Sequence, residues 1–548
     1  MLRKTISLIV CILMLSVLLS GCVGQQEEVE MESPEEDVDR ENAEEEVLQE
    51  VEQEEVVEVS QEVIAGLGRD PGTAYGYGAH PPLTRVLETL IFRDVELSYI
   101  PGLATSWEIS DDGLTWTIYL RENVKFHDGS IFDAESVKHN LERVSERWPD
   151  RFGSIKLIDI VDEYTIMVEH NEPFAPFIYC LAWPGAAMIS PDAIDEEGKV
   201  TGPIGTGPFK RVEWVPDDKL VLERNEDYWG GMPKLEKVTL KCIPDANTRM
   251  IALEAGEIDM IIDTGGVLPE HVVMLETRPE IEVLAIDGAV PHYMSLNTNK
   301  APFDDIKVRK AIMYAIDPES IIQYALESHG KLMTSITPHS EAEWLHTDTL
   351  FEFNNIEKAK GLLEEAGWVD TDDDGVLDKN GQEFKITFIL ATGLIGRWPY
   401  MTIAEIVQEQ LREIGIIVEI KVVETGLWRE SLKAGEADLS IRPWAGISPQ
   451  TRLHAWLHSE GEQNLAMGIL LSNPHIDELI DQAMMTTDDS IAQELLLEVQ
   501  EIAAEEVSVI PIYDEVLINA VQEYIEGYEL HPWFFVNWED IYVTGAVE

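Results

Sequence analysis

Residues 403–423 read IAEIVQEQLREIGIIVEIKVV, and this stretch contains the two kinds of element that build the fold. Its first part repeats apolar residues at the spacing of one helical face, and Gly415 stands where a helix commonly ends. The apolar face consists of Ile403, Ile406, Val407, Leu411 and Ile414. The residues that follow, 416–423, are rich in β-branched side chains and predict a strand.

The same order of helix and strand recurs elsewhere in the chain. A second helical pattern covers 490–506 and leads into the apolar stretch VSVIPIY, 507–513. Two earlier stretches, TWTIYL at 115–120 and DEYTIMVEH at 162–170, alternate as half-buried strands do. Helices that alternate with strands, with no internal repeat, predict an α/β fold with mixed sheets.

The N-terminus has the layout of an export signal. Arg3 and Lys4 precede an apolar run, 6–19, which is too short to cross a bilayer comfortably. The tetrapeptide LSGC that ends at Cys22 resembles the lipobox of exported lipoproteins, in which the cysteine receives a lipid. We expect residues 1–21 to be a signal peptide and lipidated Cys22 to anchor the protein to the cell membrane, facing the extracytoplasmic side. An uncleaved signal anchor is the alternative.

A dense acidic segment follows this cysteine. Between Glu27 and Glu62 there are 18 Asp and Glu residues and one basic residue, Arg40. Such a segment repels itself and buries little, so residues 22–62 are predicted to form a disordered linker. The whole chain has a formal net charge of −65, which argues against nucleic acid as a partner. A saline habitat and a cationic ligand are both compatible with this charge.

The sequence contains no recognisable catalytic motif. The glycine-rich stretch GPIGTGPF, 202–209, lacks the Lys-Ser/Thr of a phosphate-binding loop and is predicted to be a tight turn. Cys180 and Cys242 both lie in apolar segments, so we expect two separate thiols rather than a disulfide. We therefore expect a protein that is not an enzyme and requires no cofactor.

One acidic loop resembles a calcium-binding pattern. In DTDDDGVLDKNG, 370–381, the carboxylates occupy positions one, three, five and nine, and Gly375 occupies position six. The glutamate expected at position twelve is missing, and a strand, 383–390, is predicted in place of a second helix. The loop is thus no EF-hand, and a surface calcium ion or a solvated acidic hairpin are the two interpretations. The candidate ligands are Asp370, Asp372, Asp374 and Asp378.

Several longer segments resemble the peptide/nickel class, family 5, of extracytoplasmic solute-binding proteins, which serve ATP-driven (ABC) importers. The resemblance covers nearly everything after residue 63 and is carried by 102–144, 202–214, 222–230, 295–317 and 358–368. It implies a two-lobed fold like that of periplasmic binding proteins, with an extra subdomain in the first lobe. It also implies a monomer that releases its solute to membrane permease subunits.

The resemblance implies limits for the lobes. The chain should cross between them near 256–263 and near 507–513, both of which read as strands. Lobe I would consist of 63–263 plus 511–548, with the extra subdomain at about 84–200. Lobe II would consist of 264–510.

The class of solute depends on one segment of lobe II. In the peptide-binding branch, an aspartate after a tryptophan pairs with the α-amine of the peptide. Here no acidic residue lies between Trp444 and Glu460, and an ammonium buried without a partner is costly. The segment RPWAGISPQTRLHAWLHSEGE, 442–462, resembles the nickel-binding branch instead. A nickel ion or nickel chelate is therefore favoured.

The nickel branch binds a chelate between aromatic rings, with a histidine completing the metal shell, and imidazole suits Ni²⁺. The residues that the resemblance implies are Tyr75, His80, Arg147, Trp148, Trp183, Arg442, Trp444, His454 and His458. An arginine of that branch is replaced near Trp183, which leaves the chelator open. A di- or oligopeptide, a sugar, a secreted hydrolase and a structural surface protein are the alternatives.

Overall fold

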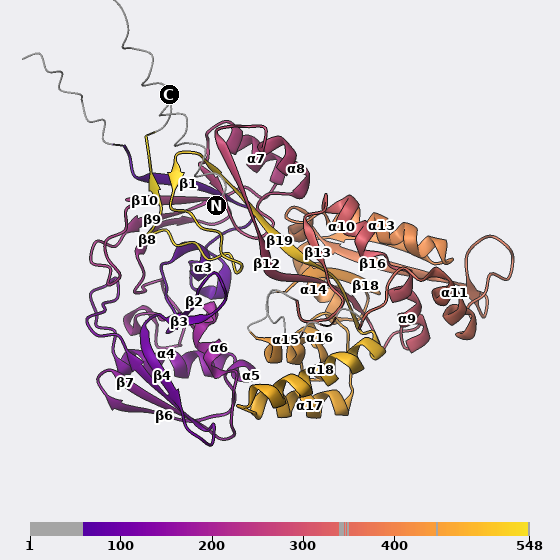
Figure 1. Cartoon of the computed structure of the whole chain (residues 1–548), viewed down its shortest axis with the longest axis horizontal. Coiled ribbons are helices and arrows are strands. Elements are labelled where there is room, and N and C mark those ends of the chain that lie inside the picture. The colour runs from indigo at the N-terminus through magenta and orange to yellow at the C-terminus, as the bar shows by residue number, and fades with distance from the viewer. Residues whose placement is uncertain (1–58, 339–344, 346, 348–349, 445–447, 546–548) are drawn as a thin grey trace, which may run out of the picture. The chain divides into compact units, whose positions relative to one another are not determined.

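Two long antiparallel strands, β12 (Ile281–Leu296) and β19 (Val509–Gln522), pair along most of their length in the computed structural model (Figure 1). The structure describes residues 59–545 except 339–344, 346, 348–349 and 445–447. Both strands belong to one 11-stranded sheet with the order β17-β16-β18-β12-β19-β11-β1-β10-β9-β8, in which β13 also pairs with β19.

The first half of this sheet comes largely from the N-terminal part of the chain. β1 pairs in parallel with β10 and β11, and β8 and β9 continue the sheet as antiparallel strands. Helix α7 packs beside β11 and helix α8 beside β12. The elements are β1 (Glu62–Leu67), α3 (Pro81–Thr84), β8 (Phe209–Val215), β9 (Lys219–Arg224), β10 (Lys237–Cys242), α7 (Ala246–Glu254), β11 (Met260–Ile261) and α8 (Pro269–Leu275).

The second half adds β18 antiparallel to β12, and β16 parallel to both β18 and β17. Its strands are β13 (Gly330–Leu332), β16 (Lys385–Ala391), β17 (Ile417–Val423) and β18 (Leu439–Pro443). Its helices are α9 (Ile306–Ala315), α10 (Pro318–Ala325), α11 (Ile356–Glu365), α12 (Thr392–Ile395), α13 (Tyr400–Glu413), α14 (Thr425–Lys433), α15 (Pro449–Leu457), α16 (Glu462–Ala466), α17 (Pro474–Met485) and α18 (Asp489–Glu506). None of the described helices combines the length and apolar character that a bilayer crossing requires.

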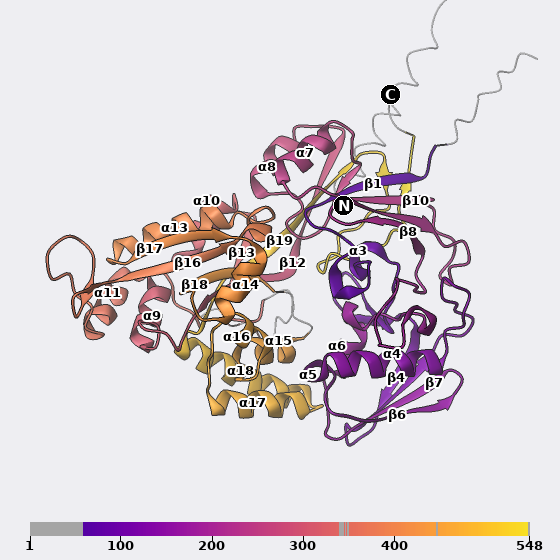
Figure 2. The ribbon, with the colours of Figure 1, turned by 180° about the vertical axis from the view of Figure 1, so that it is seen from behind.

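In both views β12 and β19 extend from the first half into the second (Figures 1 and 2). Their ladder shifts register between Asp287 and Pro291, so the strands bend between the two halves. Of the predicted crossing segments, 507–513 leads into β19, whereas within 256–263 only Met260–Ile261 forms a strand, β11. The predicted lobe limits stay a prediction. The strand pairing shows in addition that β12 is the partner of β19 through the bend.

A separate antiparallel sheet, with the order β4-β5-β7-β6, lies within the predicted subdomain range 84–200. Helix α4 packs against β6 and β7, and its first turn carries a capping box between Asp133 and Ser136. The elements are β2 (Ile91–Arg93), β3 (Tyr99–Pro101), β4 (Ala104–Ile109), β5 (Thr115–Leu120), α4 (Ala134–Arg147), α5 (Pro149–Phe152), β6 (Ile155–Asp162), β7 (Thr165–His170) and α6 (Phe177–Ala182).

The local predictions from sequence periodicity are confirmed. Helix α13 and strand β17 occupy the stretch 403–423, and Gly415 between them has a φ of +83°. The predicted strands correspond to β5, β7 and β16, and helix α18 leads into β19 as expected. Of the predicted apolar face, Ile406 alone is half-buried and the other members are buried.

The glycine-rich stretch 202–209 packs against the chain at residues 85–87. A Cβ on Gly207 would lie 1.9 Å from the carbonyl oxygen of Arg85, and one on Gly205 would lie 2.1 Å from that of Val86. The glycines are therefore required by a close approach of two backbones. The stretch thus has a packing role, and its chain bends at 202 and at 206–208 without forming the predicted tight turn.

A buried ion cluster joins the two halves where the long strands bend. The carboxylate of Asp263, which is fully buried, lies 2.6 Å from Arg69 and 3.3 Å from Arg397. Burial alone would raise the pKa of Asp263, but the two guanidiniums hold that pKa below its ordinary value. Arg69 follows β1 and Arg397 precedes α13, so one carboxylate ties the first half of the molecule to the second.

The variant Asp263→Asn tests this cluster. Asparagine tolerates the φ of +89° at this position, so the substitution removes the charge and leaves two guanidiniums without their partner. We expect the free energy of unfolding, measured by urea denaturation, to fall by about 3–5 kcal/mol. Glu254→Gln, which breaks the more exposed Arg278–Glu254 pair, should cost less than about 1 kcal/mol. Equal losses in the two variants would contradict the role of the cluster.

His170, at the end of β7, is buried in the subdomain core. Its ring lies 4.8 Å from that of Phe177 and 5.6 Å from that of Phe174. Neither ring nitrogen has a hydrogen-bond partner among the described residues. Burial therefore lowers the pKa of His170 to about 4, so the folded protein keeps this ring neutral at pH values where the unfolded chain protonates it.

The variant His170→Phe should reduce the acid sensitivity of the protein. Because the folded pKa lies below the ordinary 6.5, wild-type stability falls as the pH drops from about 6.5 to 4, by up to about 3 kcal/mol. Urea denaturation at pH 4.5 and pH 7 should show a smaller loss in His170→Phe. The exposed control His139→Phe should lose as much as wild type. An unchanged pH dependence in His170→Phe would refute this assignment.

Candidate functional site

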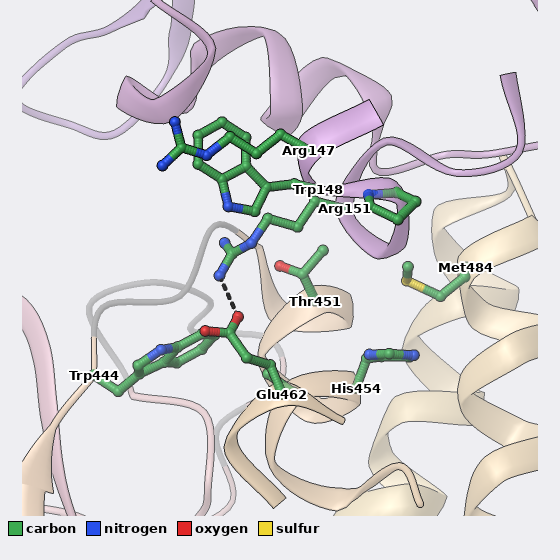
Figure 3. A pocket seen from close by; sticks show the side chains of 10 residues that line it. Arg147, Trp148, Arg151, Trp444, Thr451, His454, Glu462 and Met484 are labelled. Atoms are coloured by element: carbon green, nitrogen blue, oxygen red, sulfur yellow. Dashed lines mark hydrogen bonds and ion pairs between the residues drawn. The ribbon is translucent and has the colours of Figure 1, made fainter. Parts of the chain in front are cut away.

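A cavity of about 170 Å³ lies between the subdomain and helices α15, α16 and α17 (Figure 3). One wall comes from the end of α4 and from α5, and the other comes from the residues after β18 and the three helices. The lining residues are Arg147, Trp148, Pro149, Arg151, Trp444, Thr451, His454, Ala455, Glu462 and Met484. Segments far apart in the sequence thus meet around one cavity.

Four of the nine predicted ligand-binding residues line this cavity. Arg147 is the last residue of α4, and Trp148 follows it at the helix end. Trp444 comes directly after β18, and His454 lies in the middle of α15. The sequence analysis therefore identified side chains on both walls.

Two further predicted residues form an aromatic layer next to Trp148. The ring of Trp183 lies 4.9 Å from that of Trp148, edge to face, and Tyr75 makes a similar contact 5.6 Å from Trp183. Neither Tyr75 nor Trp183 lines the cavity. We infer that they hold Trp148 in position, since edge-to-face pairs are favourable beyond their buried area.

Two other predicted residues, His80 and Arg442, do not line the cavity. His80 is buried beside Tyr75, and burial lowers the pKa of its ring well below the ordinary value. Arg442 lies in β18, where its guanidinium is 3.8 Å from the sulfur of Met467. Burial lowers the pKa of Arg442 to about 10.

His458 stacks on His454 at 4.5 Å, one helical turn further along the chain. Its Nδ1 accepts a hydrogen bond from the backbone N–H of Glu460, and its Nε2 lies 3.6 Å from a carboxylate oxygen of Asp481. These contacts point its ring toward α17, outside the cavity lining. His458 therefore supports His454 and does not face the cavity itself.

Among the described residues, His454 is the imidazole that lines the cavity. Burial, together with the neighbouring His458, lowers its pKa to about 4, so the ring is neutral near pH 7. Neither of its ring nitrogens takes part in a hydrogen bond with another described residue. A neutral imidazole with a free lone pair is a suitable ligand for a transition metal.

The sequence analysis missed several residues of the cavity, of which Arg151 and Glu462 are charged. Arg151 Nη2 lies 2.6 Å from a carboxylate oxygen of Glu462, so the two walls are joined by an ion pair (Figure 3). The guanidinium of Arg151 also lies 4.6 Å from the ring centre of Trp183. The spacing of Arg147 and Arg151, four residues apart, was the available signal for this side chain.

The carboxylates of the acidic loop lie on the surface. Ligand atoms of Asp370, Asp372 and Asp374 come within 4.8 Å of one another, whereas Asp378 accepts hydrogen bonds from the backbone and hydroxyl of Thr371. Asp370 accepts backbone N–H groups of the loop, including that of Gly375. These bonds fit a solvated hairpin as well as a calcium site, so calcium binding stays a prediction. The hairpin of β14 (Asp378–Lys379) and β15 (Gln382–Glu383) stands where an EF-hand would have its second helix.

The two cysteines among the described residues, Cys180 and Cys242, are free thiols, as predicted. Cys180 is buried, and its sulfur lies 2.7 Å from the backbone carbonyl of Arg151, to which the thiol donates. Burial raises the pKa of Cys180 to about 12, so this thiol stays protonated. Cys242 is half-buried at the end of β10.

Comparison with known proteins places the chain in a family. The family model described as bacterial extracellular solute-binding proteins, family 5 Middle, matches residues 98–464. The chain belongs to this family. It is 29% identical over 506 residues to the glutathione-binding protein GsiB of Escherichia coli (strain K12), a match that covers 88% of this chain and 94% of the relative.

Solved structures show the same fold. NikA from Brucella suis in complex with Fe(III)-EDTA matches with a TM-score of 0.80 and 26% identity over 88% of this chain and 100% of that one. DppA from Helicobacter pylori in complex with the peptide STSA matches with a TM-score of 0.74 and 27% identity over 88% and 98%. The expected two-lobed α/β fold is confirmed, and the chain is a substrate-binding receptor of ABC importers that works outside the cytoplasm. The relatives are binding proteins, and their names point to three kinds of solute.

Proposed function

We propose that this receptor captures a small metal chelate, with nickel as the favoured metal, and delivers it to its permease. The observation that carries this proposal is the neutral imidazole of His454 in a cavity that also contains Arg147 and Arg151. The imidazole would complete the shell of the metal, and the guanidiniums would bind carboxylates of the chelator. The indoles of Trp148 and Trp444 provide flat apolar walls for it.

The size of the cavity supports a small solute. The cavity has a volume of about 170 Å³, so a long extended peptide would require the walls to separate. The backbone N–H of Ala175, in the subdomain, donates to the carbonyl of Met484 in α17, so the walls are already in contact beside the cavity.

A short peptide is the second candidate, and Glu462 is the observation that favours it. The carboxylate of Glu462 could pair with the ammonium of a peptide in the cavity. Glu462 would then take the place of the aspartate that the sequence lacks after Trp444. The arginines would then bind the carboxylates. The E. coli relative named for glutathione, itself a short peptide, adds to this candidate.

Titration calorimetry of the mature protein with nickel–histidine and with glutathione tests the two candidates. If the chelate is the solute, wild type should bind nickel–histidine, and His454→Ala and Trp444→Ala should each weaken it about tenfold or more, at least about 1.4 kcal/mol. His475→Ala is the matched control, because His475 is an exposed histidine near the start of α17 that does not line the cavity and pairs with Glu498. It should bind as wild type does.

Binding of glutathione without binding of the chelate would transfer the assignment to the peptide candidate. If neither probe binds, both assignments fail. Native mass spectrometry of protein purified from its own host would then give the mass of the solute that it carries.

We further propose that Cys22, which lies outside the described residues, carries a lipid anchor. If it does, Cys22→Ala should move the protein from the membrane fraction to the medium, because the acidic segment after Cys22 would not bind the bilayer in place of the lipid. Cell fractionation and immunoblotting would measure this change. Full retention of the variant in the membrane fraction would contradict the anchor.

A further inference from the structure

A second cavity, of about 450 Å³, lies between the β2–β3 hairpin and the C-terminal segment 529–540. Its lining shares no residue with the lining of the cavity in Figure 3. The imidazole Nε2 of His531 donates to the backbone carbonyl of Arg93, so the C-terminal segment is bonded to the hairpin at the cavity wall. This second cavity is therefore separate, residue by residue, from the proposed solute site.

Two arginines of this lining, Arg93 at the end of β2 and Arg121 directly after β5, are held in the same way. In each, Nε donates to a backbone carbonyl, at 3.0 Å for Arg93 and 3.1 Å for Arg121. Each guanidinium also lies over an indole, Arg93 at 4.5 Å from the ring centre of Trp533 and Arg121 at 4.2 Å from that of Trp229. These contacts fix the orientation of both groups before any ligand arrives.

The terminal nitrogens of these two guanidiniums have no anionic partner. Neither arginine forms an ion pair with a described residue, and the hydrogen bonds that the described residues make with their side chains end at Nε. The sequence contains 104 acidic residues and 39 Lys and Arg residues, so the cause is not a shortage of carboxylates. A partly buried charge without a partner costs free energy, which a bound anion would recover.

The carboxylates of the lining are either engaged or exposed. Glu539 lies 2.7 Å from Nη2 of Arg85, and Asp94 accepts two backbone N–H groups of its own turn. Glu529 and Asp540 are exposed, where water and salt screen their charges. The groups that remain for a ligand are therefore the two guanidiniums.

Apolar side chains complete the lining. Phe92 and Phe535 are half-buried, and Ile100 is exposed between strands of the hairpin and the open space. The guanidinium of Arg85 lies 4.9 Å from the ring centre of Phe92 and holds that ring in place. A ligand that suits this lining combines an anionic group with an apolar body.

We propose that the second cavity is a ligand site for a small organic anion, whose carboxylate or phosphate is bound by Arg93 and Arg121. The planar fork of a guanidinium matches either kind of oxyanion with two parallel hydrogen bonds. The apolar body of the ligand packs against Phe92 and Phe535. This site does not depend on the identity of the transported solute, because the two linings have no residue in common.

Titration calorimetry of the mature protein at low ionic strength tests the site with three probes: phthalate, phenyl phosphate and inorganic phosphate. At least one aromatic probe should bind, and inorganic phosphate should bind roughly tenfold more weakly because it has no apolar body. Preference for phthalate would identify a carboxylate as the natural group, and preference for phenyl phosphate would identify a phosphate. If wild type binds neither aromatic probe, the site is wrong and the proposed solute is unaffected.

Variants locate the bound probe. Arg93→Gln combined with Arg121→Gln should weaken the aromatic probe roughly tenfold or more, as for loss of hydrogen bonds to a charged group. The matched control is Arg412→Gln, on the exposed Arg412–Glu409 pair of α13, which should stay within about twofold of wild type. Loss of binding in Arg147→Gln, with binding retained in the double variant, would place the probe in the first cavity and overturn the site.

A second double variant, Arg93→Lys with Arg121→Lys, keeps both charges and removes the planar fork. It should also weaken the aromatic probe, and its melting temperature without probe should stay close to that of wild type because both cations remain over their indoles. This variant keeps the test decisive if the glutamine variant fails to fold. Full binding by the lysine variant would show that charge alone attracts the anion, and would contradict a site built from the two guanidinium forks.

Discussion

One buried carboxylate, that of Asp263, connects the two halves of the molecule. It is held between Arg69 and Arg397, which belong to different halves, at the point where β12 and β19 bend. Glu515 in β19 adds contacts to the same region, because it accepts the backbone N–H of Gly265 and the indole N–H of Trp398. The residues of this cluster are not among those that line the cavity.

The cavity brings together groups that are each common in proteins, such as an arginine at a helix end and a histidine in a helix. Their surroundings differ because α5 and α15 face each other across a small space. Burial there lowers the pKa of His454 to about 4, whereas the Glu462 side chain stays 60% exposed. Trp148, Trp183 and Tyr75 form an aromatic layer next to this space.

The sequence predicted the elements well and the site in part. Periodicity located α13, which buries one face, and β-branched residues located β17. The apolar run 507–513 located the start of β19, which is buried along nearly its whole length. It did not locate β12, whose apolar and polar residues alternate poorly since its two parts lie in different surroundings. Arg151 and Glu462 were missed because their ion pair forms only when the two walls of the cavity come together in the folded chain. No local sequence pattern predicts an ion pair between residues so far apart. His80, Arg442 and His458 do not line this cavity, and their role at the solute stays a prediction.

The pairing of β12 with β19 also has a consequence for how the chain matures. Ile281 in β12 pairs with Gln522 in β19. Strand β11, the neighbour of β1 near the start of the described chain, pairs with β19 as well. Neither half of the sheet can be completed until nearly the whole polypeptide has been synthesised, and such distant pairings form slowly. The sheet of this extracellular receptor is therefore completed only when the late strand β19 becomes available to both β11 and β12.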